Sequence, residues 1–307
     1  MQCLRRHAAR ACAESKAAPA SARYGHGMTL LSVLVVLDDD AGCDTRVQLA
    51  ARFAARQGSH LIGVAPTGLM DLSPGFAAAA HHLDAAALVR AEAVRHAMDR
   101  VQRFRARCKA EGVASVEADV FEGDKAAVVL HQAHCADLVV IGQPDPASVS
   151  LREEKRFVEQ LILHNVRPTL LVPHAGRFDM LGDKVLVAWD DSPGAARAVA
   201  DALPLLRQAR QVHVRAWRGA DAAAEQPIRA RLEVVQGWLR RQGVACDARV
   251  EATTAPIGET LLDSAARLGV DLVVMGAYGH ARWTERIVGG TTRTALARSP
   301  LPLLMSH

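Results

Sequence analysis

Small residues gather in one segment near the carboxyl end of the chain. Gly276 and Gly279 flank a short turn, and Gly289 and Gly290 precede a run with helical character. Glycine lets a backbone turn sharply and approach a ligand closely because it has no Cβ. The first amides of a helix point outwards without intrahelical partners and attract anions. Each glycine alone could serve only a turn, but together they predict a cradle for a phosphate group.

Side chains in the same segment add hydrogen-bond donors to this cradle. Thr291 and Thr292 place hydroxyl groups at the predicted helix start. His280 and Arg282 supply further donors, and the guanidinium of Arg282 carries a permanent positive charge. Far away in the sequence, Asp190 follows another apolar run, where its carboxylate can accept hydrogen bonds from a sugar or a base. The combination is typical of a nucleotide site.

The elements around these residues follow the pattern of a parallel sheet. Short β-branched runs alternate with helical periodicity, which predicts an α/β fold with helices on both faces of the sheet. Residues 30–37 form a near-continuous apolar strand, and residues 83–109 form a long helix. Ligands of open parallel sheets bind beyond the carboxyl ends of the strands. Asp190 and Gly276 each follow or end such a strand.

The pattern occurs twice. The segment DLVVIG at 137–142 returns as DLVVMG at 271–276, and the strand at 30–37 matches a strand at 184–189. Repetition on this scale predicts two copies of one domain and not one large sheet. The expected division is an N-terminal extension (1–28, disordered or upstream of a native start at Met28), a first domain (29–174), a linker (175–183) and a second domain (184–307).

The second copy resembles a universal stress protein domain. ATP-binding members of that family carry G-x-x-G, nine residues, and then Gly followed by Ser or Thr. Here the motif Gly276-Ala-Tyr-Gly279 is followed by nine residues and then Gly289. The sequence departs at the next position, where Gly290 stands in place of the hydroxyl residue and Thr291 comes one position later. The resemblance implies a flavodoxin-like (HUP-type) fold with a five-stranded parallel sheet in the order 3-2-1-4-5.

The resemblance also implies a ligand. In the family, the motif glycines line the phosphates, and the aspartate after the first strand contacts the adenosine. Those roles fall on Gly276, Gly279, Gly289 and Asp190. The implied ligand is ATP, with AMP or another adenine nucleotide as alternatives and Mg²⁺ as an optional companion. Gly290 can still donate its amide, but the missing hydroxyl would weaken triphosphate binding.

The first copy resembles the same family, but its site is degenerate. Gly142 is retained, whereas Asp145 stands where the second glycine of the motif should be. Its carboxylate would repel phosphate, and Glu153 and Glu154 lie close by in sequence. We therefore expect this copy not to bind ATP. Asp38 follows the first strand, but without a cradle we interpret it as a turn residue.

The resemblance further implies how the two copies pack. Family members usually pair through the fifth strand, so residues 169–172 and 301–305 are expected to pair within the chain. This pairing would satisfy two exposed sheet edges and form a pseudo-dimer. A homodimer of the whole chain and an unidentified protein partner both stay open.

The function implied is a stress-response sensor or regulator that binds the nucleotide without a dedicated catalytic group. Hydrolysis, if any, would be slow, since no base–nucleophile pair is visible near the cradle. One alternative is a phosphotransfer enzyme, for which Asp190, Asp191 and Glu285 are the carboxylates available to hold a metal ion. Another is an interaction protein without a ligand.

Composition argues against several other classes. No apolar run is long enough for a membrane span. Residues 1–27 hold five basic residues and one acid, so the rest of the chain falls from 37 to 32 basic and from 33 to 32 acidic residues, with no net charge. With few aromatics as well, no nucleic-acid partner is expected. The six cysteines form no CxxC pair, which favours free thiols and a cytoplasmic location.

Overall fold

The computed structural model describes residues 30–69, 83–277 and 290–307. Its first half alternates strands and helices as the sequence predicts, beginning with an apolar strand. The elements in chain order are β1 (Ser32–Val36), α2 (Cys43–Gln57), β2 (His60–Pro66), α4 (Leu83–Ala110), β3 (Ser115–Phe121), α5 (Lys125–Ala133), β4 (Leu138–Gly142), α6 (Leu151–His164) and β5 (Thr169–Val172).

The second half repeats this order with one helix divided in two. Its elements are β6 (Lys184–Ala188), α7 (Pro193–Asp201), α8 (Leu203–Leu206), β7 (Gln211–Arg218), the short 3₁₀ helix η2 (Ala222–Ala224), α9 (Glu225–Arg241), β8 (Asp247–Ala252), α10 (Ile257–Leu268), β9 (Leu272–Gly276), α11 (Gly290–Arg298) and β10 (Leu303–Ser306).

The described strands form one continuous sheet in the order β3-β2-β1-β4-β5-β10-β9-β6-β7-β8. Each half contributes five parallel strands in the predicted order 3-2-1-4-5. The halves meet where β10 pairs antiparallel with β5, with Leu304 opposite Leu170. The intrachain pairing through the fifth strands is confirmed. The expectation that repetition excludes one large sheet is wrong, because this pairing merges two five-stranded sheets into one.

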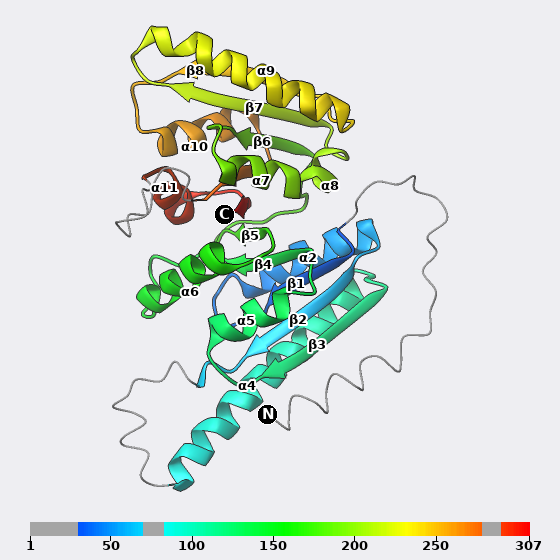
Figure 1. The fold of residues 1–307 in the computed structure, drawn as a ribbon. Coiled ribbons are helices and arrows are strands. Elements are labelled where there is room, and N and C mark those ends of the chain that lie inside the picture. The colour runs from blue at the N-terminus through cyan, green and yellow to red at the C-terminus, as the bar shows by residue number, and fades with distance from the viewer. Residues whose placement is uncertain (1–29, 70–82, 278–289) are drawn as a thin grey trace.

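Helices cover both faces of this sheet and bury two apolar layers (Figure 1). One layer contains residues of α2, α4, α7, α8 and α9, and the other contains residues of α5, α6, α10 and α11. Successive residues of β1 alternate between the layers: Val33 and Val35 belong to the first, Leu34 and Val36 to the second. Covering on both faces explains why the strands are continuously apolar.

Two helices differ from their predicted extent. The apolar periodicity after β6 suggests one helix through Leu206, but α7 ends at Asp201 and α8 follows. Pro204 is the cause, because it has no amide hydrogen to continue the helical ladder. Helix α6 begins at Leu151, before its apolar face starts at Phe157, since its first turn is polar. The start of α7 follows from its sequence: Ser192 caps the helix, and proline occupies the first turn.

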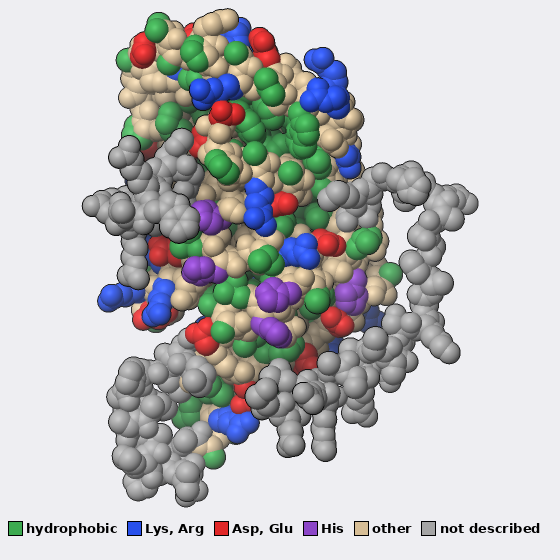
Figure 2. Space-filling view, viewed as in Figure 1, with side chains coloured by type: hydrophobic (Ala, Val, Ile, Leu, Met, Phe, Trp, Pro, Cys, Tyr) green, Lys and Arg blue, Asp and Glu red, His purple; other side chains and the backbone are tan. Residues whose placement is uncertain are grey.

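The surface carries charges of both signs. On the face shown in Figure 2, Lys and Arg side chains are interspersed with Asp and Glu, and several histidines lie across the middle. This mixture agrees with the balanced charge of the chain after the N-terminal extension. Within the described ranges, no helix is both long and apolar enough to cross a membrane.

Candidate functional site

The turn from β6 to α7 places Asp190 at the carboxyl end of β6. Its Oδ1 accepts a hydrogen bond from the amide of Ser192 at 3.0 Å, and the side chain is exposed. Asp191 has a φ of 61°, in the left-handed region of the backbone that residues other than glycine rarely adopt. Its carboxylate lies 3.3 Å from Nη1 of Arg231 on α9. The chain therefore makes a tight, strained turn that leaves Asp190 at the surface of the strand end.

Gly276 ends β9, the strand that pairs with β6. A Cβ added here would lie 2.4 Å from the amide nitrogen of Ala195 and 2.6 Å from the carbonyl carbon of Gly194. Both neighbours are backbone atoms in the first turn of α7, so they cannot move aside cheaply. The structure thus gives Gly276 a packing role in addition to any contact with a ligand: it lets α7 and β9 meet at the strand ends.

Helix α11 begins at Gly290 and contains no acidic residue in its first turn. Because α11 is the crossover between the parallel strands β9 and β10, its first turn lies at the edge of the sheet where Gly276 ends β9. Gly290 is exposed, and a Cβ there would meet no described atom within 4 Å. Thr291 is half-buried, whereas Thr292 is only 4% exposed. The described start of α11 therefore carries no acidic side chain, and Gly290 adds no side-chain bulk there.

The structure brings together part of the predicted site. Asp190 and Gly276 lie at the carboxyl ends of paired strands, as the sequence predicts. The predicted contributions of Gly279, His280, Arg282 and Gly289 lie outside the described residues. His307 also lies beside this edge, with Nδ1 3.1 Å from the carbonyl oxygen of Ala277. No motif in the sequence includes His307.

The corresponding corner of the first domain is filled by an arginine. Arg46, on α2, is fully buried. Its Nη2 donates to Asp38 at 2.5 Å, its Nη1 to Asp40 at 2.8 Å, and its Nε to the carbonyl of Val36 at 3.1 Å. A Cβ on Gly142 would lie 2.2 Å from Nη1. The guanidinium therefore occupies the point between β1 and β4 where a sheet of this type receives ligands.

Asp38 is thus more than a turn residue, and that interpretation is corrected here. Burial alone would raise the pKa of Asp38, but the attraction of Arg46 and hydrogen bonds from Arg46 and Asp40 bring that pKa below its ordinary value. Burial is also the largest influence on Asp40, and with the nearby Asp38 carboxylate it raises the pKa of Asp40 to about 6. The guanidinium of Arg46 faces two carboxylates, and Asp40 is the one that binds a proton more readily.

The start of α6 in the first domain is occupied by its own acids. Asp145 donates its amide to Glu154 at 3.3 Å and accepts the amide of Ala147 at 2.8 Å. Glu154 also accepts hydrogen bonds from the hydroxyls of Ser148 and Ser150. These contacts close the turn before α6 with two carboxylates. The equivalent segment of the second domain lies outside the described residues.

Sequence reasoning missed Arg46, although a signal was available. Arg46 follows Asp38 by the same interval as Ala198 follows Asp190, and both side chains are fully buried. A comparison of the two copies position by position would have shown an arginine in the apolar face of one helix and an alanine in the other. A buried arginine requires carboxylate or carbonyl partners. Asp38 and Asp40 are such partners.

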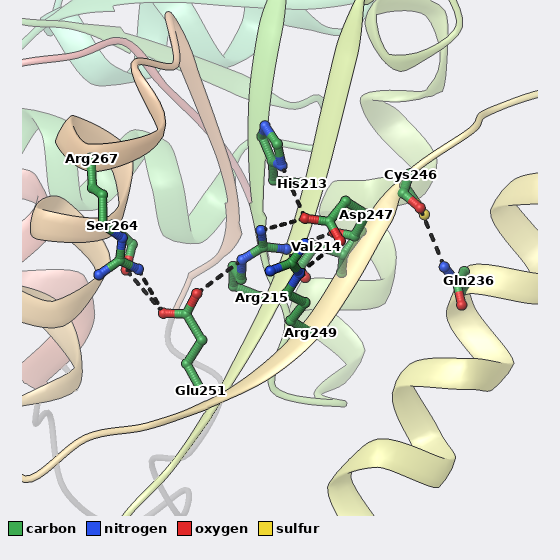
Figure 3. Close-up of polar contacts among 10 residues, drawn as sticks. All are labelled: His213, Val214, Arg215, Gln236, Cys246, Asp247, Arg249, Glu251, Ser264 and Arg267. Atoms are coloured by element: carbon green, nitrogen blue, oxygen red, sulfur yellow. Dashed lines mark hydrogen bonds and ion pairs between the residues drawn. The ribbon is translucent and has the colours of Figure 1, made fainter.

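A second buried arginine lies away from the strand ends (Figure 3). Arg215 on β7 donates to the carboxylate of Asp247 at 2.7 Å, and its Nε lies 3.1 Å from Glu251. Asp247 also pairs with Arg249, and Glu251 pairs with Arg267 of α10. Burial opposes ionisation of Asp247, but the two arginines outweigh it and lower its pKa to about 2.

This network ties the terminal strand β8 to β7 and α10 and lies within the layer that α10 covers. By strand register, the counterpart of Arg215 in the first domain is Val64, which is fully buried among apolar side chains. Over the described ranges, no group of three or more His, Cys, Asp or Glu side chains could hold a metal ion.

Comparisons with known proteins agree with this architecture. Residues 182–307 match the family model of the universal stress protein family. A universal stress protein from Archaeoglobus fulgidus DSM 4304 superposes with a TM-score of 0.61 at 18% identity, covering 89% of this chain and 97% of that chain. A putative universal stress protein from Pseudomonas aeruginosa UCBPP-PA14 gives 0.58 at 17% identity, covering 90% and 92%. No curated protein sequence matches the chain.

The fold is therefore the tandem α/β architecture seen in those two structures, with both halves of the chain included. Residues 182–307 are thus similar to the universal stress protein family, and the fold of both halves is similar to that of solved universal stress proteins.

Proposed function

We propose that the second domain binds an adenine nucleotide at the edge formed by β6, β9 and the start of α11. Asp190 would accept hydrogen bonds from the adenosine, and the amides that begin α11 would hold the phosphates. The observation that supports this most directly is the placement of Asp190 and Gly276 at the ends of two paired strands. It occurs in the half of the chain that matches the universal stress protein family model.

ATP is the proposed ligand, with Mg²⁺ as a companion ion and AMP or a cyclic adenine nucleotide as the alternatives. The protein would act as a stress-response regulator in the cytoplasm, and nucleotide occupancy would be what a protein partner senses. Cys43, Cys108, Cys135 and Cys246 are free thiols, in keeping with a reducing compartment.

We further propose that the first domain binds no nucleotide. Two features support this: Arg46 fills the space between the strand ends, and carboxylates already close the start of α6. A triphosphate brought to that helix would face Asp145 and Glu154 rather than free amides. The expected stoichiometry is one nucleotide per chain.

The most direct test is to identify what copurifies with the full-length protein. We expect an adenine nucleotide to be released on denaturation and detected by mass spectrometry. Calorimetry of the nucleotide-free protein with ATP, AMP and cyclic AMP should then give one site per chain. Absence of any adenine nucleotide in both measurements would remove the proposed function.

A substitution within the motif tests the location. Gly279→Asp would copy the acid of the first domain into the second, and like-charge repulsion should weaken ATP binding by more than about 100-fold. Gly237→Asp is the matched control: it adds the same charge on α9, where the nearest atom to a new Cβ is 3.6 Å away. Unchanged ATP affinity in Gly279→Asp would show that the nucleotide binds elsewhere.

A further inference from the structure

The residue after Gly142 in the first domain reaches into the second. Gln143 is only 3% exposed, and its backbone amide donates to Val172 within the first domain. Its side-chain Nε2 donates to the carbonyls of Leu296 at 3.0 Å and Ser299 at 3.3 Å. Its Oε1 faces Nδ1 of His174 at 3.0 Å. The side-chain amide is thus shared between the two domains.

The two carbonyls belong to the carboxyl end of α11. In a regular helix, the carbonyl of Leu296 would accept the amide of residue 300, but that residue is Pro300 and has no amide hydrogen. The side-chain hydroxyl of Ser299 is already donated to Leu301. A buried carbonyl without a donor is destabilising, so the end of α11 depends on a donor from another element. Gln143 is that donor.

We propose that Gln143 is a positioning residue for the nucleotide site of the second domain. This inference rests on the proposed function, since the amides at the other end of α11 are the proposed phosphate donors. A helix is a stiff rod, so fixing the carboxyl end of α11 also fixes where its first amides lie. Donors must be placed within a few tenths of an ångström to bond a phosphate oxygen well. The first domain therefore sets the phosphate geometry of the second.

The side-chain contact made by Gln143 is not repeated at the equivalent position of the second domain. The counterpart of Gln143 in the second domain is Ala277, which follows Gly276 as Gln143 follows Gly142. Alanine has no side-chain donor, so Ala277 cannot cap the end of α6 in return. In the first domain, the segment after Gly142 lacks the G-x-x-G motif, and its residue Gln143 instead contacts the end of α11 in the second domain.

The test compares two variants of the full chain. Gln143→Leu keeps the approximate side-chain volume and the backbone bond to Val172 but removes the donor. Gln57→Ala is the control, because Gln57 makes a different hydrogen bond between the domains, to Gln208 at 2.6 Å. Gln57 ends α2 and Gln208 follows α8, and both helices pack on the face of the sheet opposite α11. Calorimetry measures the affinity for ATP and for adenosine, and amide hydrogen exchange measures the protection of α11.

We expect Gln143→Leu to weaken ATP binding by about fivefold or more while adenosine binding changes by less than about twofold. Exchange of the α11 amides should rise in this variant and stay unchanged in Gln57→Ala. Equal losses for ATP and adenosine, or exchange indistinguishable from Gln57→Ala, would overturn the inference. If the wild-type protein binds no adenine nucleotide, the proposed function fails separately, and hydrogen exchange alone decides whether Gln143 anchors α11.

Discussion

The two domains share one strand arrangement but finish its ligand corner differently. In the first, Arg46 of α2 bonds Asp38 and Asp40 and fills the space between β1 and β4. In the second, Ala198 takes the same place on α7 and Ser192 takes that of Asp40, so no arginine occupies the position of Arg46. A single buried side chain, Arg46, therefore distinguishes the described parts of the two corners.

The comparison also separates two ways of losing an anion site. Sequence reasoning identified a repulsive acid, Asp145, at the phosphate position. The structure adds a positive group that neutralises the strand-end aspartates, which would otherwise face a sugar. In the first domain, both the strand-end aspartates and the turn before α6 are thus engaged in internal contacts. The predictions below test this difference.

Removing the internal cation should have the largest effect. Arg46→Ala leaves Asp38 and Asp40 without their buried partner, which should lower the free energy of unfolding by about 3–5 kcal/mol. Urea unfolding would measure it. Arg46→Ala combined with Asp40→Ser copies Ala198 and Ser192 of the second domain and should recover part of the loss. A loss below about 1 kcal/mol in the single variant would mean that the corner does not depend on the ion pairs.

The substitution Gly276→Ala should have the next largest effect on the free energy of unfolding. The new Cβ would meet backbone atoms of α7 at 2.4 Å, so the strand or the helix must shift, at a cost of about 3 kcal/mol. Gly290→Ala is the control, since a Cβ there meets no described atom, and its effect should stay within about 0.5 kcal/mol. Thermal unfolding without nucleotide compares them. Equal stability would show that Gly276 serves only a ligand.

Arg215→Val copies Val64 of the first domain and should cost less than Arg46→Ala. Asp247 and Glu251 keep Arg249 and Arg267 as partners, and Asp247 is partly open to solvent. We expect a loss of about 2 kcal/mol, below the range for breaking a fully buried pair. Chemical denaturation measures it, with Arg249→Ala as an exposed control near zero. A gain in stability would show that valine packs there as well as in β2.

The smallest effect concerns pH. Because the folded pKa of Asp40 is raised to about 6, the folded state holds a proton that the unfolded chain has released between about pH 4 and pH 6. The free energy of unfolding should therefore rise as the pH falls from 7 to 5. Asp40→Asn should remove roughly 1 kcal/mol of this rise. Parallel stability curves for wild type and variant would contradict the assignment.

Much of the fold could be predicted because the sheet is covered on both faces. Buried parallel strands are apolar almost throughout, and the repeated DLVVIG and DLVVMG segments fix the same strand in both copies. The polar first turn of α6 and the break before Pro204 were not predicted, since periodicity reports only the buried face of a helix.

The candidate site was predictable where backbone position alone decides it. The positions of Asp190 and Gly276 follow from where the apolar strands β6 and β9 end. Arg46 and Gln143 do not, because their roles depend on partners that the fold brings close: Gln143 and Leu296 are 153 positions apart. No local pattern around either residue announces such a contact, although the alignment of the two copies would have exposed Arg46 opposite Ala198.

The antiparallel pairing of β5 with β10 inside one polypeptide has a genetic consequence. When two identical subunits join through that strand, every substitution is present twice, so an arginine that closes one corner closes both. Here the halves are encoded separately and held at fixed stoichiometry. One half is free to carry Arg46 and Gln143, while its neighbour carries Ala198 and Ala277 at the equivalent positions.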